Sequence, residues 1–164
     1  MSTATAQPQL RTPQQLYEDW EGAHWAARDI DLSRDPEQWR SMVLTNVLGP
    51  AYTTRAAIPA LKESQGHIVL TSSVAGRRAL PGSLYSCTKH AVTAMGEALR
   101  QDLNETGVRV TSIEPGMVDT PFFDNRPTGA LEPDDIARAV LYAVSQPRHV
   151  DVNEILIRPT AQGT

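Results

Sequence analysis

Disulfides, long apolar runs and a targeting segment are missing from this sequence of 164 residues. The one cysteine, Cys87, cannot form an internal disulfide, and we interpret it as a small packed residue rather than a reactive thiol. The longest uninterrupted apolar run, 139–144, has six residues, whereas a membrane-spanning helix needs about 18 or more. The first eleven residues, MSTATAQPQLR, lack the basic start and apolar stretch of a secretory signal. We therefore expect a cytoplasmic protein that does not cross a membrane.

Concentrated positive charge is missing as well. Fifteen Lys and Arg stand against nineteen Asp and Glu, which gives a net charge of −4. Nucleic-acid backbones are bound by concentrated basic patches, and Arg77-Arg78 alone does not supply one. We predict a small-molecule substrate and no nucleic-acid partner. Arg77-Arg78 is expected in a solvated loop; alternatively, the pair faces an anionic substrate or the cofactor. The four histidines and the cysteine show no metal-ligand spacing, so no metal is predicted.

Apolar residues make up 40% of the chain and charged residues 21%, which is ordinary usage for a protein with a packed core. Helical and strand patterns alternate from Asp35 onward. The predicted elements are a long helix from 35 toward 61, a strand at 67–71, a helix at 85–104, a strand at 108–113, a helix at 133–145 and a strand at 154–157. This α-β-α-β-α-β order predicts an α/β fold, with a parallel sheet and helices on its faces.

The first long helix has a clear start and an irregular middle. Asp35 suits the N-cap and Pro36 the first helical position. Four apolar residues recur at three- and four-residue steps and predict a stripe facing the core: Trp39, Met42, Val43 and Val47. Because Pro50 has no N–H, the carbonyl of Asn46 is expected to lack its helical partner, and we predict a bend there that frees it for an ordered water. Alternatively, Pro50 only curves the helix around the core. Gly66 is expected to end the helix.

Three groups of residues are expected at one edge of the sheet: Ser72-Ser73, Tyr85 with Lys89, and Pro115-Gly116. Open parallel sheets bind their ligands at the carboxyl ends of the strands. Tyr85 and Lys89 are four residues apart on one helix, and an ammonium beside a phenol favours the phenolate. A hydroxyl at the adjoining strand end would hold a substrate oxygen where Tyr85 transfers a proton. A Tyr–Lys pair alone is usually an ordinary feature of a solvent-exposed helix. It is the pair together with Ser72-Ser73 and Pro115-Gly116 that favours a catalytic site.

Four short motifs follow one another along the chain at fixed intervals. They are Asn46-Val47-Leu48-Gly49, Ser73-Val74-Ala75-Gly76, Tyr85-Ser86-Cys87-Thr88-Lys89 and Pro115-Gly116-Met117-Val118-Asp119-Thr120. The first Asn and the Ser are 27 residues apart, the Ser and the Tyr 12, and the Tyr and the Lys 4. In these motifs and intervals the chain resembles the short-chain dehydrogenase/reductase family over roughly 35–162. The resemblance implies a Rossmann-like fold and an NAD(P)-dependent oxidoreductase that interconverts an alcohol and a carbonyl.

The resemblance also implies roles for individual residues. Tyr85 would be the general acid/base and Ser73 would position the substrate oxygen. Lys89 would bind the nicotinamide ribose and tune Tyr85, and Asn46 would hold a relay water. The cofactor-binding residues implied are Tyr85, Lys89, Pro115, Gly116, Val118 and Thr120. The ending 153–162 resembles NADP-preferring members that act on small hydroxy acids or aldehydes, so NADP is slightly favoured over NAD. The family's two long helices pack against a second subunit, which implies a homo-oligomer.

The glycine-rich, adenosine-binding half of that family has no counterpart here. The pattern G-x-G occurs nowhere in the sequence, and 34 residues precede Asp35. We interpret residues 1–34 as a tail with the pattern of a short helix over 13–30, and residues 35–164 as the catalytic half, a truncated Rossmann-like sheet of about three strands. The absence argues against cofactor binding, and hence activity, by this chain alone.

Two functional interpretations follow. The first is the oxidoreductase; the second is a non-catalytic relative that acts as an oligomerisation or partner-binding module. Without a neighbour, the strand at 67–71 would present an exposed apolar edge. Its expected cover is the 13–30 helix, a second copy of the chain or a separate polypeptide.

Overall fold

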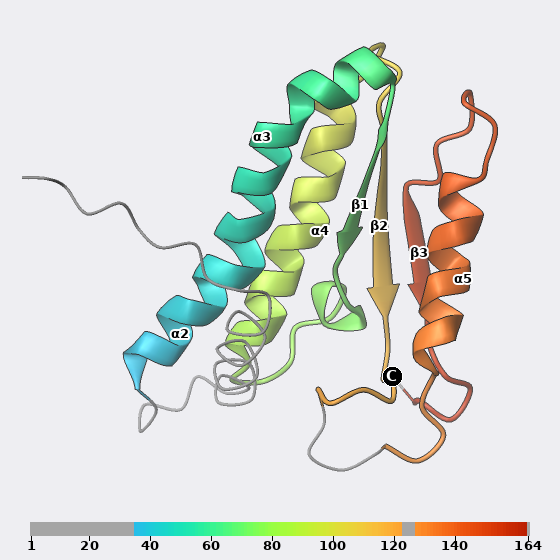
Figure 1. Ribbon diagram of the computed structural model, residues 1–164. Helices are drawn as coiled ribbons and strands as arrows, with labels where there is room; N and C mark the ends of the chain where they lie inside the picture. Colours follow the sequence, from blue (N-terminus) through green and yellow to red (C-terminus); the bar gives the residue numbers. More distant parts are fainter. Residues whose placement is uncertain (1–34, 123–126, 164) are drawn as a thin grey trace, which may run out of the picture.

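The computed structural model describes residues 35–122 and 127–163, so the predicted tail and its 13–30 helix lie outside the described residues. The elements follow the predicted order (Figure 1). They are α2 (Pro36–Val43), the π-helical turn η1 (Leu44–Leu48), α3 (Gly49–Ser64), β1 (His67–Thr71), the 3-10 turn η2 (Val74–Gly76), α4 (Leu84–Asp102), β2 (Arg109–Pro115), α5 (Pro133–Val144) and β3 (Glu154–Ile157).

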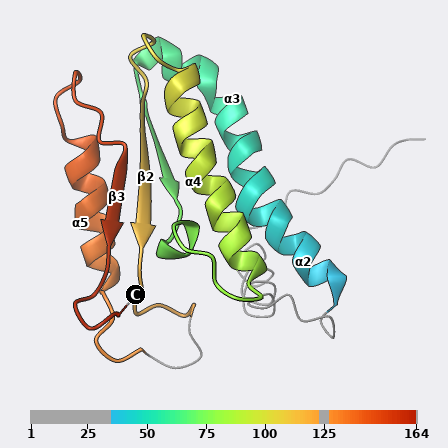
Figure 2. The ribbon, with the colours of Figure 1, turned by 180° about the vertical axis from the view of Figure 1, so that it is seen from behind.

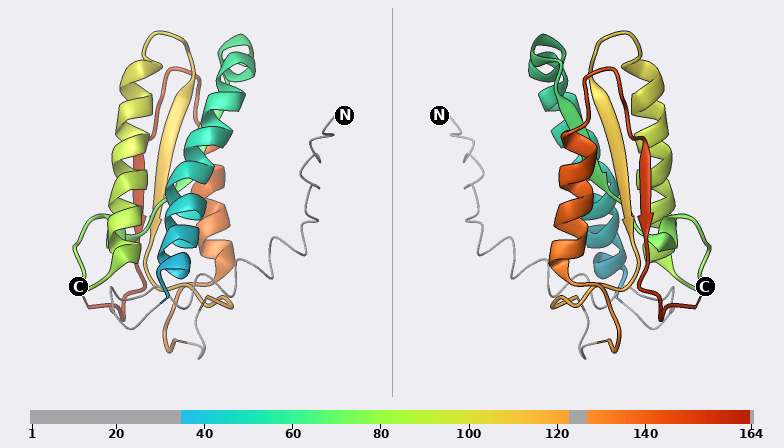
Figure 3. Two further views of the ribbon diagram at one scale, coloured as in Figure 1. Left: turned by 90° about the vertical axis from the view of Figure 1, so that its left-hand side faces the viewer. Right: turned by 90° about the vertical axis from the view of Figure 1, so that its right-hand side faces the viewer.

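The sheet has three parallel strands in the order β1-β2-β3, which confirms the predicted fold class. Helices α3 and α4 lie on one face and α5 on the other, as the views from in front and from behind both show (Figures 1 and 2). The two side views bring α3 forward in one case and α5 in the other (Figure 3). Because the strands are parallel, their carboxyl ends meet at one edge of the sheet, where ligands of such folds bind.

A buried apolar cluster lies between the sheet and the two helices α3 and α4. It consists of Ile68, Leu70, Val92, Leu103, Val108 and Val110, with Ile58, Leu61, Met95 and Leu99 packed against it. Close packing is possible because Gly96 has no side chain: a Cβ there would collide with the Ser112 hydroxyl of β2. The burial of α4 against β1 and β2 therefore fixes the helix over the carboxyl ends of both strands.

The long N-terminal helix departs from regular α geometry where the sequence predicts it. Asp35 caps α2 by accepting from the Glu37 N–H. The interruption at Asn46 is a π-helical turn, in which the Gly49 N–H donates to the carbonyl of Leu44, five residues back. A free Asn46 carbonyl stays a prediction. Val43 was expected on the buried stripe but is 37% exposed, because it lies about 100° round the helix from buried Met42.

The end of α3 and the loop after β1 differ from expectation in detail. Gln65, not Gly66, ends the helix in the left-handed conformation, with φ of 51°. Its side-chain oxygen accepts from Arg148, which helps to hold this conformation. The segment between β1 and α4, for which the sequence predicts no helix, contains η2, whose first N–H groups are satisfied by Ser73.

Strand β1 lies at the edge of the sheet among the described residues, as predicted. Its Ser72 end and the preceding Gly66 bond to β2, so the alternate residues His67, Val69 and Thr71 point their backbone groups outward. An open groove of about 500 Å³ runs along this edge beside α3. What covers the edge stays a prediction.

Candidate active site

The predicted site residues come from four segments that meet at the carboxyl edge of the sheet. Ser73 follows β1, and Pro115 ends β2. Tyr85 and Lys89 lie in the first two turns of α4, whose N-terminus is at the same edge. The fourth segment is the π-helical turn, from which Asn46 reaches α4. The fold thus brings together residues that are 69 positions apart in the chain, from Asn46 to Pro115.

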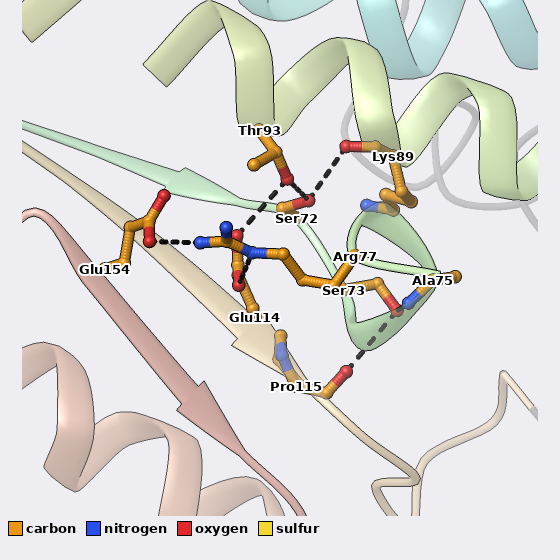
Figure 4. Close-up of polar contacts among 9 residues, drawn as sticks. All are labelled: Ser72, Ser73, Ala75, Arg77, Lys89, Thr93, Glu114, Pro115 and Glu154. Carbon is orange, nitrogen blue, oxygen red and sulfur yellow. Dashed lines mark hydrogen bonds and ion pairs between the residues drawn. The ribbon is translucent and has the colours of Figure 1, made fainter. Parts of the chain in front are cut away.

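Ser73 connects the ends of two strands. Its side chain caps η2 by accepting from the Ala75 N–H at 3.1 Å. The same hydroxyl donates to the Pro115 carbonyl at 3.4 Å, a long bond that leaves its proton available to a better acceptor (Figure 4). The residue is 8% exposed, so its position is set by the protein and not by solvent.

Tyr85 and Lys89 lie side by side, as their spacing predicts. The Lys89 amine is 5.5 Å from the centroid of the Tyr85 ring, and it donates to the Thr71 carbonyl at 3.0 Å. Desolvation by burial lowers the pKa of Lys89 to about 8. The amine is therefore charged at neutral pH and loses its proton above about pH 8. Phe122 closes the other side of Tyr85, with ring centroids 5.7 Å apart and an interplanar angle of 47°.

Asn46 is tied to the same helix through its side chain. Its Nδ2 donates to the Thr88 hydroxyl at 3.1 Å, and that hydroxyl donates to the Tyr85 carbonyl at 2.8 Å. Both Asn46 and Thr88 are buried. The π-helical turn is therefore docked on the turn of α4 that carries Tyr85 and Lys89, and Asn46 and Lys89 both line the groove beside β1.

The segment after β2 is held by the C-terminal tail. The Gly116 N–H donates to the Ile157 carbonyl at 2.7 Å, and the Met117 N–H donates to Gln162 Oε1 at 2.9 Å. A Cβ on Gly116 would collide with that Gln162 oxygen, so a side chain there would require Gln162 to move and give up this bond. Farther along, Val118 bridges to Leu131 and the Thr120 hydroxyl accepts from the Phe122 N–H at 3.3 Å. The four residues expected at the nicotinamide end thus form one continuous, anchored segment.

Sequence reasoning missed a buried ion pair beside Ser73. Arg77 was expected to be solvated, but its Nε donates to Glu114 Oε2 at 2.6 Å, and the Glu114 side chain is fully buried. The signal was present, because a glutamate at the end of a strand expected to lie inside a parallel sheet requires a partner. The prediction for Cys87 was also wrong: it is exposed, on the outer side of α4.

Two kinds of site are not found in the part of the chain that the structure describes. No group of three or more His, Cys, Asp or Glu residues is arranged to hold a metal ion within 35–122 and 127–163. Over the same residues, no helix combines the length and apolar character that crossing a bilayer requires.

The family model described as short chain dehydrogenase matches residues 22–130. Together with the sheet, the motif order and the grouping of the site residues at its carboxyl edge, this match defines the class. The chain belongs to the short-chain dehydrogenase family.

Individual relatives agree with the family assignment. An uncharacterized oxidoreductase of Staphylococcus aureus strain MRSA252 is 46% identical over 128 residues, covering 75% of this chain and 55% of the relative. The crystal structure of serine dehydrogenase from Escherichia coli is 35% identical with a TM-score of 0.74, covering 84% of this chain and 60% of that one. The closed form of serine dehydrogenase, complexed with NADP+, is 32% identical with a TM-score of 0.75, covering 84% and 62%. The chain therefore spans 55% to 62% of the length of these relatives.

Proposed function

We propose that the chain is an NAD(P)-dependent oxidoreductase that interconverts an alcohol and a carbonyl on a small substrate. The observation that carries the proposal is the Lys89 amine 5.5 Å from the Tyr85 ring, at the strand end that holds Ser73. An acid/base phenol, a cation beside it and a fixed hydroxyl are the groups that proton transfer to a carbonyl oxygen needs. Similarity to a serine dehydrogenase solved with NADP+ supports NADP over NAD and a small hydroxy acid as substrate.

The residues present fit the nicotinamide end of such a cofactor. The Lys89 amine and the Tyr85 hydroxyl provide donors for a ribose diol, and the segment with Pro115, Gly116, Val118 and Thr120 lies at the same edge of the sheet. When bound, the nicotinamide supplies the hydride acceptor or donor. The adenosine end has no glycine-rich turn in this sequence, so we propose that this chain alone binds the cofactor weakly.

The proton chemistry belongs to the chain's own residues. Ser73 donates its weakly held proton to the substrate oxygen and orients it toward Tyr85. Tyr85 takes up or releases the proton as the alcohol is oxidised or the carbonyl reduced. Charged Lys89 stabilises the phenolate, and its pKa of about 8 keeps it charged at neutral pH. Asn46 holds a water at its carbonyl, through which the proton exchanges with solvent.

The test compares wild type with Tyr85→Phe in oxidation of a panel of small hydroxy acids by NADP+, followed by the absorbance of NADPH. We expect Y85F to lower kcat/KM about 10²–10⁴-fold, because only the hydroxyl that carries the proton is removed. The matched control is Tyr142→Phe on α5, an exposed tyrosine far from the carboxyl edge. Equal turnover by wild type and Y85F, or none by either, would reject the proposal.

A non-catalytic role is the second candidate, favoured by the exposed edge of β1 and the groove beside it. In that case the chain binds a partner, or a second copy through α3 and α4, and has lost catalysis. Titration with NADH and NADPH, followed by tryptophan fluorescence, separates the two candidates. Saturable binding at or below millimolar cofactor supports the enzyme, and no binding at millimolar cofactor supports the module.

A further inference from the structure

A fully buried carboxylate lies directly behind the candidate catalytic serine. Glu114 is the penultimate residue of β2, and its side chain has no exposed surface. One oxygen accepts from Arg77 Nε at 2.6 Å and the other from the Thr93 hydroxyl at 3.2 Å (Figure 4). Burying a charge is costly unless it is paired and hydrogen-bonded, and Glu114 is both.

The hydrogen-bond directions follow from the carboxylate. An ionised carboxylate only accepts, so the Thr93 hydroxyl must donate to it. Thr93 is then free to accept from the Ser72 hydroxyl, 2.8 Å away. The Ser72 hydroxyl also donates to the Lys89 carbonyl of α4 at 3.0 Å, so its single proton is shared between these two acceptors. Ser72, Thr93 and Glu114 therefore form one connected hydrogen-bond cluster.

The same carboxylate thus holds both ends of one short segment. Ser72 is attached through Thr93 and Arg77 is attached directly, and Ser73 lies between them. Gly76 closes the segment over this cluster, because a Cβ there would lie 2.6 Å from the Ser72 hydroxyl and 2.7 Å from the Lys89 carbonyl oxygen. Arg77 also forms an ion pair with Glu154 of β3, which extends the attachment to all three strands.

We propose that Glu114 is a positioning residue for Ser73. It fixes Ser73 against α4 and against the segment that begins at Pro115, directly after Glu114. Glu114 does not touch the substrate; it acts through Arg77 and Thr93. The catalytic purpose of this attachment rests on the proposed function of Ser73. The attachment itself rests on the hydrogen bonds and the ion pair of Glu114 described above.

The test is amide hydrogen exchange, followed by NMR, in Glu114→Gln and Thr93→Val. Both variants keep the side-chain shape; the first removes the charge and the second removes the hydroxyl that connects α4. We expect the amides of Ala75, Gly76 and Arg77 to exchange about five- to tenfold faster, because charge-assisted bonds are roughly twice as strong as neutral ones and this segment opens locally without them. The Ser112 amide of β2, which donates to the carbonyl of Asn153 directly before β3, should exchange at the wild-type rate.

The control is Glu154→Gln, which removes the half-exposed partner of Arg77 and leaves the contacts of Glu114 in place. It should change exchange in the segment less than about twofold. A uniform increase at Ser112 and in the segment would show general destabilisation and overturn the proposal. Unchanged exchange in the segment, or an E154Q effect as large as that of E114Q, would overturn it as well. If E114Q fails to fold, T93V by itself tests the proposal.

A kinetic readout separates this proposal from the proposed function. In a chain that turns over substrate, E114Q should lower kcat about tenfold with an unchanged KM for NADP+, since Ser73 acts on the substrate oxygen and not on cofactor binding. A tenfold loss of kcat/KM that came from a raised KM for NADP+ would contradict the positioning of Ser73. Where wild type shows no turnover, the proposed function fails, while the exchange measurements still decide whether Glu114 holds the segment.

Discussion

At Lys89, the proposed chemistry and the stability of the fold favour opposite charge states of the amine. Its amine is buried between the Tyr85 ring and the Thr71 carbonyl, and desolvation lowers its pKa from 10.5 to about 8. Catalysis requires the cation beside the phenol, whereas burial favours the neutral amine. Below about pH 8 the folded chain carries the charge at the cost of desolvation. Such a cost, borne by a functional side chain, is typical of active sites.

This conflict predicts how stability depends on pH. The unfolded chain binds the Lys89 proton more tightly than the folded chain, since the folded pKa is the lower one. The free energy of unfolding of wild type, relative to Lys89→Met, should therefore be constant below pH 8 and rise by roughly 1–3 kcal/mol between pH 8 and 10.5. Urea unfolding at several pH values measures it. Lys62→Met, on the exposed side of α3, is the control, and a difference that is flat or falls with pH would contradict the burial of the amine.

At the scale of elements, the site depends on η2 lying close against α4. The 3-10 turn follows β1 immediately, is capped by Ser73 and ends at Arg77. Its glycine faces the backbone of α4 at a distance that no side chain allows. The turn therefore carries the candidate serine into contact with the helix that carries Tyr85 and Lys89.

Adding one methyl group should push these two elements apart. We expect Gly76→Ala to lower the free energy of unfolding by about 1–3 kcal/mol, because the Lys89 carbonyl on one side and two hydroxyls on the other leave no space for a Cβ. Denaturant unfolding measures the change. Gly163→Ala, where a Cβ meets nothing within 4 Å, should change it by less than about 0.5 kcal/mol. Equal denaturant midpoints for G76A and wild type would contradict this prediction, because η2 would then accommodate the methyl group without loss of stability.

At the scale of the whole molecule, the described residues form one side of the candidate active site and leave one sheet edge open. The candidate catalytic groups and the segment from Pro115 to Thr120 lie at the carboxyl edge. The outer edge of β1 carries a groove but no neighbouring strand within 35–122 and 127–163. Relatives of the chain are longer, since it spans 55% of the S. aureus oxidoreductase and 60% of the E. coli serine dehydrogenase.

This arrangement predicts an unusual ligand preference. Residues that fit the nicotinamide end are present, whereas G-x-G, which would cradle the pyrophosphate, occurs nowhere in the sequence. For this chain, NADPH and reduced nicotinamide mononucleotide should therefore bind with dissociation constants within about tenfold of each other, about 1.4 kcal/mol. Calorimetric titration with each ligand measures the ratio. A preference of about a hundredfold or more for the dinucleotide would reveal an adenosine site elsewhere in the chain.

Local signals determined most of the fold. The N-cap Asp35 with Pro36, the apolar periodicity of α4 and the β-branched runs of β1 and β2 are short-range patterns, so element order and the parallel sheet were predictable. The loop after β1 was not predictable in detail, because η2 exists through contacts of Ser73 and Gly76 with segments far along the chain. Val43 and Cys87 were misassigned for a related reason: periodicity gives a helix face, and only packing decides how much of that face is covered.

By itself the sequence determined the elements, their order and the identity of the candidate residues, because these depend on spacing along the chain. Tertiary structure alone decided that the Lys89 amine is buried enough to lower its pKa, that Asn46 docks on Thr88, and that Arg77 pairs with Glu114. Desolvation, hydrogen bonding and ion pairing depend on distances between groups that are far apart in the chain, 42 residues for Asn46 and Thr88 and 37 for Arg77 and Glu114, and no local pattern encodes such distances.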